Sequence, residues 1–160
     1  MSIKVGDKMP SGTLTLATND GPQKVSTEEF FKGKRVVLFS VPGAFTPTCD
    51  AKHLPGFVER AADIRAKGID TIACISVNDA FVMKAWGKSQ NCDGKVVMIA
   101  DGNAEYTKAL GLEMDASGFG MGTRGQRFAL VVDDGVVKSV NVEQKGEFKV
   151  SGGEGGLGQL

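Results

Sequence analysis

Residues 35–49 read RVVLFSVPGAFTPTC, and this stretch decides the fold. After Arg35, the run to Val41 is apolar and β-branched with a single serine, which is typical of a strand buried on both faces. The following segment, 42–48, is rich in proline, glycine and threonine, so we expect a loop. Cys49 then opens a helical pattern. The stretch therefore predicts a strand–loop–helix unit with a cysteine where the loop becomes the helix.

Strand and helix patterns alternate on both sides of this unit. Towards the N-terminus, residues 13–17 alternate like a half-exposed strand, and Ser26 or Thr27 caps a short helix containing Phe30 and Phe31. Towards the C-terminus the pattern predicts a helix from 49 to about 67 kinked by Pro55, a strand at 69–77, a helix capped by Asn78 or Asp79, a strand at 95–100, a helix at 104–110, and strands at 127–132 and 136–142 joined by a turn at 133–135.

This order of elements predicts an α/β fold of thioredoxin-like layout, with a central mixed β-sheet flanked by helices and an N-terminal extension. The chain has 160 residues of even composition, which fits a single domain over residues 1–160. Residues 151–160 contain five glycines. Ordering such a segment costs much conformational entropy, so we expect the tail to be mobile or loosely docked.

Composition narrows the function classes. The net charge is zero at pH 7 and no basic stripe is visible, so we expect no nucleic-acid partner. The longest apolar stretch, 36–45, is broken by Ser40, Pro42 and Gly43 and is too short to cross a bilayer, so we expect no membrane partner. The first residues lack the apolar core of a signal peptide, which predicts a cytoplasmic protein.

The three cysteines favour reactive thiol chemistry over a structural role. They are odd in number and irregularly spaced, in a chain without a secretion signal, which disfavours a disulfide framework. They form no C-x-x-C pair, and His53 is the only histidine, so we expect no metal site.

Cys49 is the strongest candidate nucleophile. It lies where a buried strand passes into a helix, the place at which open α/β sheets bind ligands. Backbone N–H groups and the helix dipole stabilise a thiolate there. An inert core cysteine is the alternative, but the prolines, glycine and threonines of residues 42–48 make a core position awkward.

Thr46 and Cys49 have the spacing of a C-x-x-C redox motif whose first cysteine is replaced by threonine. A dithiol exchanger needs both sulfurs, so the chain should not act as an ordinary thioredoxin. The Thr46 hydroxyl could donate a hydrogen bond to sulfur and accept one from a substrate. It could also cap the helix, and the two roles are compatible.

The segment from Val41 to Cys49, with HLPGF at 53–57 after it, closely resembles the active-site segment of the peroxiredoxins. The branch it is similar to contains mammalian peroxiredoxin 5 and the plant type II enzymes. The pattern P-x-x-x-T-x-x-C is complete in Pro42, Thr46 and Cys49. Residues 75–79 (ISVND) and the Arg-Phe pair at 127–128 extend the resemblance, which covers residues 3–142.

The resemblance implies a thiol-dependent peroxidase for hydrogen peroxide and alkyl hydroperoxides. Cys49 would be the nucleophile and would become a sulfenic acid. Thr46 would bond the substrate and the sulfur, and Pro42 would shield the sulfenate from water. Arg127 would stabilise the thiolate and the charge on the oxygens. Arg124 is the rival arginine, but Arg127 begins a strand as it does in the family.

The resemblance further implies catalysis without metal, haem or flavin, and a homodimer. The dimer would form through apolar residues in or beside loops near the site: Phe45, Phe81, Met83, Trp86, Phe119 and Met121. The reductant would be glutathione with glutaredoxin, or thioredoxin.

Resolution of the sulfenic acid is where the chain departs from its family. Its C-terminal segment lacks the resolving cysteine of mammalian peroxiredoxin 5. Cys74 lies inside a strand, roughly 10 Å below the sheet edge, whereas a disulfide needs Cα atoms within about 7 Å. Cys92 lies in a polar loop, where we expect it to be exposed, but across a helix from Cys49. We therefore favour a one-cysteine cycle with glutathione, with Cys74 left open because plant relatives have a cysteine at a matching spacing.

Three other interpretations compete with this one. His53 invites a Cys–His hydrolase, but no third orienting group is evident, so we expect a structural or supporting role for it. The GMGTRG segment at 120–125 matches G-x-G-x-x-G but precedes a strand, which rejects a dinucleotide site. A redox sensor or holdase of the same fold is the third, and repeated turnover would distinguish it from a peroxidase.

Overall fold

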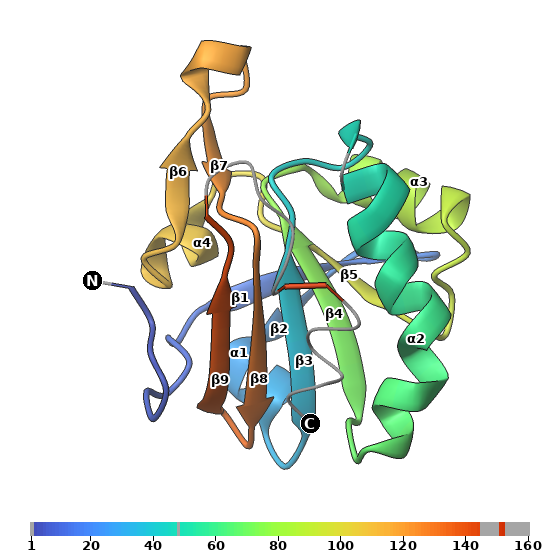
Figure 1. The fold of residues 1–160 in the computed structure, drawn as a ribbon, viewed down its shortest axis with the longest axis vertical. Helices are drawn as coiled ribbons and strands as arrows, with labels where there is room; N and C mark the ends of the chain where they lie inside the picture. The colour runs from blue at the N-terminus through green and yellow to red at the C-terminus, as the bar shows by residue number, and fades with distance from the viewer. Residues whose placement is uncertain (1, 48, 145–150, 153–160) are drawn as a thin grey trace.

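The structure is a computed structural model that describes residues 2–47, 49–144 and 151–152. Its centre is a seven-stranded sheet in the order β2-β1-β5-β4-β3-β8-β9 (Figure 1). The strands of this sheet are β1 (Thr13–Thr18), β2 (Gly21–Ser26), β3 (Arg35–Ser40), β4 (Thr71–Ser76), β5 (Val97–Ala100), β8 (Phe128–Asp133) and β9 (Val136–Val142).

The sheet is mixed, as the sequence predicts. Strands β3, β4 and β5 are parallel, while β1 and β8 run antiparallel to their neighbours β5 and β3. Ser40, the last residue of β3, pairs with Ile75 of β4 on one side and with Phe128 of β8 on the other. The end of β3 and the start of β8 therefore meet at one edge of the sheet, and the candidate site forms there.

Helices cover both faces of the sheet (Figure 1). Helices α2 (Leu54–Ala66) and α3 (Ala80–Ser89) pack with Val37 and Phe39 of β3 in one apolar core. Helices α1 (Thr27–Phe31) and α4 (Glu105–Ala109) belong to the second core, with Val36 and Leu38. Successive side chains of β3 point to opposite faces, which explains why its sequence is apolar throughout. The α/β class with helices on both faces is confirmed.

The predicted helix starts are confirmed by their capping contacts. Ser26 Oγ accepts a hydrogen bond from Glu29 N at 3.2 Å, and Asp79 Oδ1 accepts one from Val82 N at 2.9 Å. The helix expected to run continuously from Cys49 instead begins with a π-helical turn, Cys49–His53, before α2. Pro55, in the first turn of α2, has no N–H to donate, so a regular α-helical ladder cannot run through this point.

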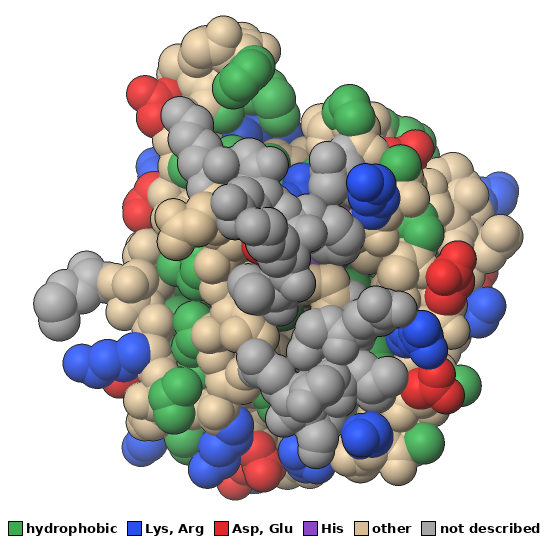
Figure 2. All heavy atoms as spheres, in the orientation of Figure 1, with side chains coloured by type: hydrophobic (Ala, Val, Ile, Leu, Met, Phe, Trp, Pro, Cys, Tyr) green, Lys and Arg blue, Asp and Glu red, His purple; other side chains and the backbone are tan. Residues whose placement is uncertain are grey.

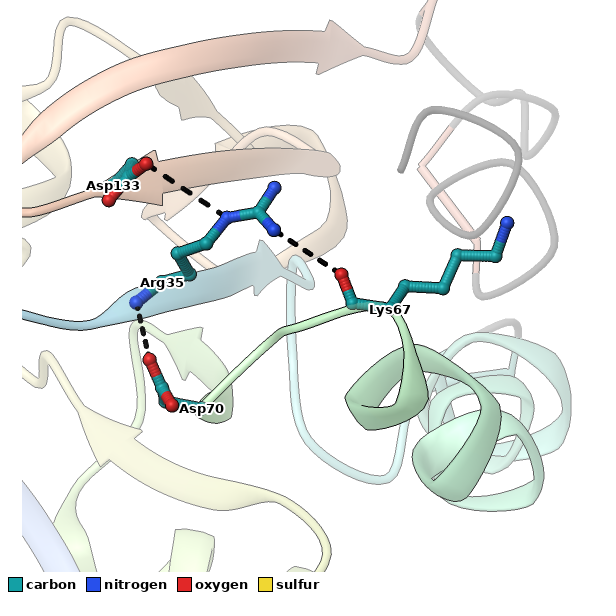
Figure 3. Close-up of polar contacts among 4 residues, drawn as sticks. All are labelled: Arg35, Lys67, Asp70 and Asp133. Atoms are coloured by element: carbon teal, nitrogen blue, oxygen red, sulfur yellow. Dashed lines mark hydrogen bonds and ion pairs between the residues drawn. The ribbon is translucent and has the colours of Figure 1, made fainter.

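Polar contacts tie the sheet together at the edge opposite the site (Figure 3). The Arg35 backbone N–H donates to Asp70 Oδ2 at 2.9 Å, and Arg35 Nη1 donates to the Lys67 carbonyl at 3.3 Å. Arg35 Nε lies 4.0 Å from Asp133 Oδ2, with both side chains well exposed. These contacts link the starts of β3 and β4 to the end of β8, and so help to fix the strand register that places the site residues.

Three strands were not expected from the sequence. Strand β2 reads GPQKVS and lacks the apolar alternation of a strand, but it pairs along its whole length with β1. The others, β6 (Glu113–Asp115) and β7 (Thr123–Gly125), form a separate two-stranded sheet around the 3-10 turn Ser117–Phe119. Edge strands and three-residue strands carry little periodic signal, because only pairing with a neighbour defines them.

Only Ser151 and Gly152 of the glycine-rich tail are described, and both are buried. At these two residues the structure differs from the expected loose tail, and the expectation for 153–160 lies outside the described residues. On the face drawn in Figure 2, acidic and basic side chains are interspersed. Among the described helices, none is long and apolar enough to cross a membrane.

Candidate active site

Cys49 opens the π-helical turn and is wholly buried. The residue after it, Asp50, anchors this turn to α3: its Oδ1 accepts from Trp86 Nε1 at 2.8 Å and from Gln90 Nε2 at 2.9 Å. Trp86 was expected on an interface near the site, but it is wholly buried. Met83, expected there too, is also buried, because α3 turns both side chains towards the core. Trp86 therefore holds the turn that carries Cys49 from the core side, through its hydrogen bond to the Asp50 side chain.

Arg127 comes to Cys49 from a point 78 residues away in the sequence. Its Nη2 donates a hydrogen bond to Cys49 Sγ at 3.1 Å. Arg127 immediately precedes β8, whose first residue pairs with Ser40 at the end of β3. A guanidinium is permanently charged, and a hydrogen bond from it is strongest when the acceptor carries negative charge, as an attacking sulfur does.

Arg124, the rival arginine, serves the active-site loop and not the sulfur. Its Nη1 donates to the Pro42 carbonyl at 3.2 Å and its Nε to the Met121 carbonyl at 3.0 Å. The same loop is held on its other side by Asn78, whose Oδ1 accepts from Ala44 N at 3.0 Å. The loop that carries Pro42 is thus fixed by contacts from two distant segments.

Thr46 lies in this loop, and its hydroxyl donates to the Gly43 carbonyl at 2.7 Å. The resemblance implied a hydrogen bond from Thr46 to the sulfur, and the described residues do not make that contact. The turn explains the difference: Phe45 adopts a positive φ of 63°, which folds Thr46 back on Gly43. Because the hydroxyl proton is donated to Gly43, the Thr46 oxygen can make further hydrogen bonds only as an acceptor.

His53 lies within the aromatic core beside Arg127. Its ring is wholly buried, with centroids 5.0 Å from Phe39 and 5.7 Å from Phe57. Nδ1 lies 2.8 Å from Arg127 Nη1, and Nε2 lies 2.8 Å from the Ser151 carbonyl oxygen. Burial, and secondarily the Arg127 charge, lowers the pKa of His53 to about 3. The imidazole is therefore neutral at neutral pH and supports the arginine.

The other two cysteines are both buried. Cys74 lies in β4 between Phe39 and Met98, and burial raises the pKa of its thiol well above the usual value. Cys92 was expected to be exposed, but only 2% of it is accessible. It packs beside Gly87 of α3, next to Met98, and burial raises the pKa of the Cys92 thiol to about 11.

The sequence missed several residues that shape the site. Glu143 and Ser151 form a buried contact behind His53, while Asp50 and Asn78 hold the turn and the loop. No local pattern marks Asp50, Glu143 or Ser151, and Asn78 was noted only as a possible helix cap and as part of the segment 75–79, because these contacts join parts of the chain that are separated in sequence. Within the described part of the chain, no group of three His, Cys, Asp or Glu side chains is placed to hold a metal ion.

Comparison with known proteins gives consistent matches over nearly the whole chain. The Redoxin family model matches residues 4–157. Peroxiredoxin-2B of Arabidopsis thaliana is 53% identical over 150 residues, which is 93% of each chain. The crystal structure of reduced Prx3 from Vibrio vulnificus in complex with H2O2 superposes with a TM-score of 0.94 at 52% identity, covering 98% of each chain. A Burkholderia cenocepacia protein provisionally described as a thioredoxin reductase superposes with a TM-score of 0.98 at 50% identity, covering 100% of this chain and 99% of that one.

Proposed function

Because this chain belongs to the Redoxin family and is a peroxiredoxin with the thioredoxin-like fold of that family, we propose that it reduces hydroperoxides at Cys49 through a sulfenic acid. Peroxidase activity that depends on thiols is the function its relatives support. The observation that carries the assignment to Cys49 is the 3.1 Å hydrogen bond from Arg127 Nη2 to its sulfur. A permanently charged donor on the sulfur can stabilise the negative charge of the attacking nucleophile.

In the proposed step the Cys49 thiolate attacks one oxygen of the hydroperoxide. An S–O bond forms, the O–O bond breaks, and the sulfur is oxidised by two electrons to S–OH. The departing alkoxide or hydroxide takes up a proton and leaves as alcohol or water. Arg127 stabilises the charge that moves from sulfur to the leaving oxygen. Thr46 accepts a hydrogen bond from the peroxide hydroxyl, and Pro42 keeps water from the sulfenic acid.

We propose that glutathione completes the cycle, with glutaredoxin or a second glutathione. The first thiol attacks Cys49–SOH, forming a mixed disulfide and releasing water; the second regenerates the Cys49 thiol and leaves oxidised disulfide. The state of the other cysteines supports this external route. Cys74 and Cys92 are buried, and burial raises both of their pKa values, so neither supplies much attacking thiolate. Thioredoxin as the electron donor is the alternative.

The experiment is a peroxide consumption assay with glutathione and glutaredoxin, beside one with thioredoxin. Wild type should cycle many times and carry one added oxygen on Cys49 when peroxide is given without reductant. Cys49→Ser should abolish both signals, while Cys74→Ser and Cys92→Ser should keep most of the glutathione-dependent turnover. A 49–74 disulfide in oxidised protein, together with loss of cycling in Cys74→Ser, would overturn the one-cysteine route. A single oxidation event without turnover would instead indicate a sensor.

A thioredoxin reductase activity is less well supported. Dithiol exchange needs two neighbouring thiols, and Thr46 stands where a C-x-x-C motif ending at Cys49 would have its first cysteine. Three free cysteines also fit a reducing compartment, and we propose a cytoplasmic location on that ground. Some relatives are located elsewhere: a peroxiredoxin-2E of Arabidopsis thaliana is chloroplastic by name.

We also propose that the protein is a homodimer. Among the residues that the structure describes, three aromatic side chains are well exposed: Phe45 at 51%, Phe81 at 74% and Phe119 at 80%. Phe45 belongs to the active-site loop, and Phe119 to the turn between β6 and β7 that projects from the body of the molecule (Figure 1). Burial of these side chains against a second copy would remove apolar surface from water close to the site.

A further inference from the structure

A chain of polar groups, buried at Glu143, Ser151 and His53 and half-buried at Arg127, leads from the C-terminal segment to the nucleophile. Glu143 Oε2 accepts two hydrogen bonds from Ser151, at 2.8 Å from its N–H and at 2.7 Å from its hydroxyl. The Ser151 carbonyl oxygen lies 2.8 Å from His53 Nε2, and His53 Nδ1 lies 2.8 Å from Arg127 Nη1. Arg127 then donates to Cys49. Figure 1 shows the described tail residues, drawn in red, crossing in front of the central sheet.

The two neighbours of His53 define which nitrogen carries its proton. A carbonyl oxygen only accepts hydrogen bonds, so His53 Nε2 is the donor to Ser151. A guanidinium only donates, so Nδ1 must be bare and accept from Arg127. A protonated imidazole would turn Nδ1 into a donor facing a second donor, and the low pKa of His53, caused mainly by burial, keeps the ring neutral.

We propose that His53 is a positioning residue for Arg127, and that the Ser151–Glu143 contact sets its tautomer and thereby orients the guanidinium on the Cys49 sulfur. This inference rests on the proposed function. The ring plane is fixed by the flanking Phe39 and Phe57, and the Ser151 carbonyl selects the nitrogen that is protonated. Residues that do not touch Cys49 thus influence its reactivity.

Arg127 is held from both ends by this arrangement. Its backbone carbonyl accepts from the Glu143 N–H at 2.9 Å, while its Nη1 donates to the imidazole. Glu143 therefore fixes the backbone of the arginine directly and its side chain through Ser151 and His53. A long flexible side chain loses much rotamer entropy when it is immobilised, and preorganised partners lower that cost before the peroxide arrives.

Two amide substitutions of His53 test the roles of its two ring nitrogens separately. Asn at position 53 puts an acceptor oxygen near the place of Nδ1 and loses the donor to Ser151. Gln puts a donor near the place of Nε2 and loses the acceptor for Arg127. If His53 positions Arg127, His53→Gln should slow Cys49 oxidation by about tenfold to a hundredfold, the worth of one hydrogen bond to a charged group. His53→Asn should react at least several times faster than His53→Gln.

The measured quantity is the second-order rate of Cys49 oxidation by H2O2, followed by quenched-flow mass spectrometry. In an Arg127→Ala background, His53→Gln should change this rate by less than about twofold, because its effect passes through the arginine. Glu143→Ala should slow oxidation in the protein that retains Arg127 and should leave the rate of the Arg127→Ala variant almost unaffected. Glu143→Gln keeps an acceptor for Ser151, so it should recover most of the rate.

Several results would overturn the inference. One is a folded His53→Gln protein that reacts as fast as wild type. Another is that His53→Gln slows the reaction equally whether position 127 is arginine or alanine, which would indicate a merely structural role. A third is His53→Asn reacting more slowly than His53→Gln. Failure of the proposed function looks different, because wild-type Cys49 itself would then resist oxidation by peroxide.

Discussion

Acidification should destabilise the folded protein through His53, the one histidine of the chain. In the folded state the ring is wholly buried and burial holds its pKa at about 3, whereas an unfolded histidine titrates at about 6.5. Below about pH 6.5 the histidine therefore binds a proton in the unfolded chain but not in the folded chain. The contribution of the neutral His53 to the free energy of unfolding is fully present above about pH 6.5, and it is lost as the pH falls from about 6.5 towards 3.

The size of the effect follows from the two pKa values. A pH of about 5 lies about 1.5 units below the pKa of the unfolded histidine. Each of these units lowers the free energy of unfolding by about 1.4 kcal/mol. The folded ring, with a pKa of about 3, is still almost entirely neutral. The free energy of unfolding should therefore fall by about 2 kcal/mol between about pH 7.5 and 5, with a slope approaching one proton.

Urea unfolding at a fixed protein concentration, followed by the fluorescence of Trp86, measures this quantity. His53→Asn is the matched control, because it cannot titrate while carboxylates and other groups remain the same. Wild type should lose about 2 kcal/mol more than the variant over this range. Equal losses in the two proteins would show that the buried imidazole is not held neutral, and would refute the hydrogen-bond pattern assigned to its two nitrogens.

Three further outcomes are expected. Arg127→Ala should slow peroxide reduction about a hundredfold, the usual loss of a donor to developing charge, and Arg124→Ala should do less in the same assay, since its contacts go to loop carbonyls. A larger effect of Arg124→Ala would reverse the assignment. Phe119→Glu should shift a dimer to monomers in sedimentation, and a wild type that is already monomeric at micromolar concentration would contradict the dimer. Phe57→Ala should cost about 3–5 kcal/mol in urea unfolding, because its ring stacks on Phe39 at 3.9 Å in the core, and a loss below about 1 kcal/mol would count against that packing.

Much of the fold could be predicted because the core elements carry their own burial pattern. The run at 35–41 is apolar on both faces, and the structure places Val37 and Phe39 in one core and Val36 and Leu38 in the other. Capping residues marked the helix starts at Ser26 and Asp79 for an equally local reason. Strand β2 was not predicted because Gly21–Ser26 lacks the apolar alternation of a strand, and only its pairing with β1 defines it.

Residue exposure was harder to predict from local sequence. The polar neighbours of Cys92 suggested an exposed loop, yet the residue is 2% exposed and packs beside Gly87 and Met98. Trp86 and Met83 resembled interface residues, but the orientation of α3 puts both into the core. Exposure depends on what lies opposite a side chain, and that partner belongs to another part of the chain.

The sequence by itself determined the class of fold, the cysteine at the strand–helix junction and, through the motif around it, the family. Those properties depend on short stretches whose periodicity and residue types act locally. Only the tertiary structure decided that Arg127 Nη2 reaches Cys49, that His53 is neutral between Arg127 and Ser151, and that Glu143 holds Ser151. These groups lie up to 98 residues apart and meet because the register of β3, β8 and β9 puts them at one edge of the sheet. Buried polar groups must find partners within the core, and the packed sheet determines which partners are in reach.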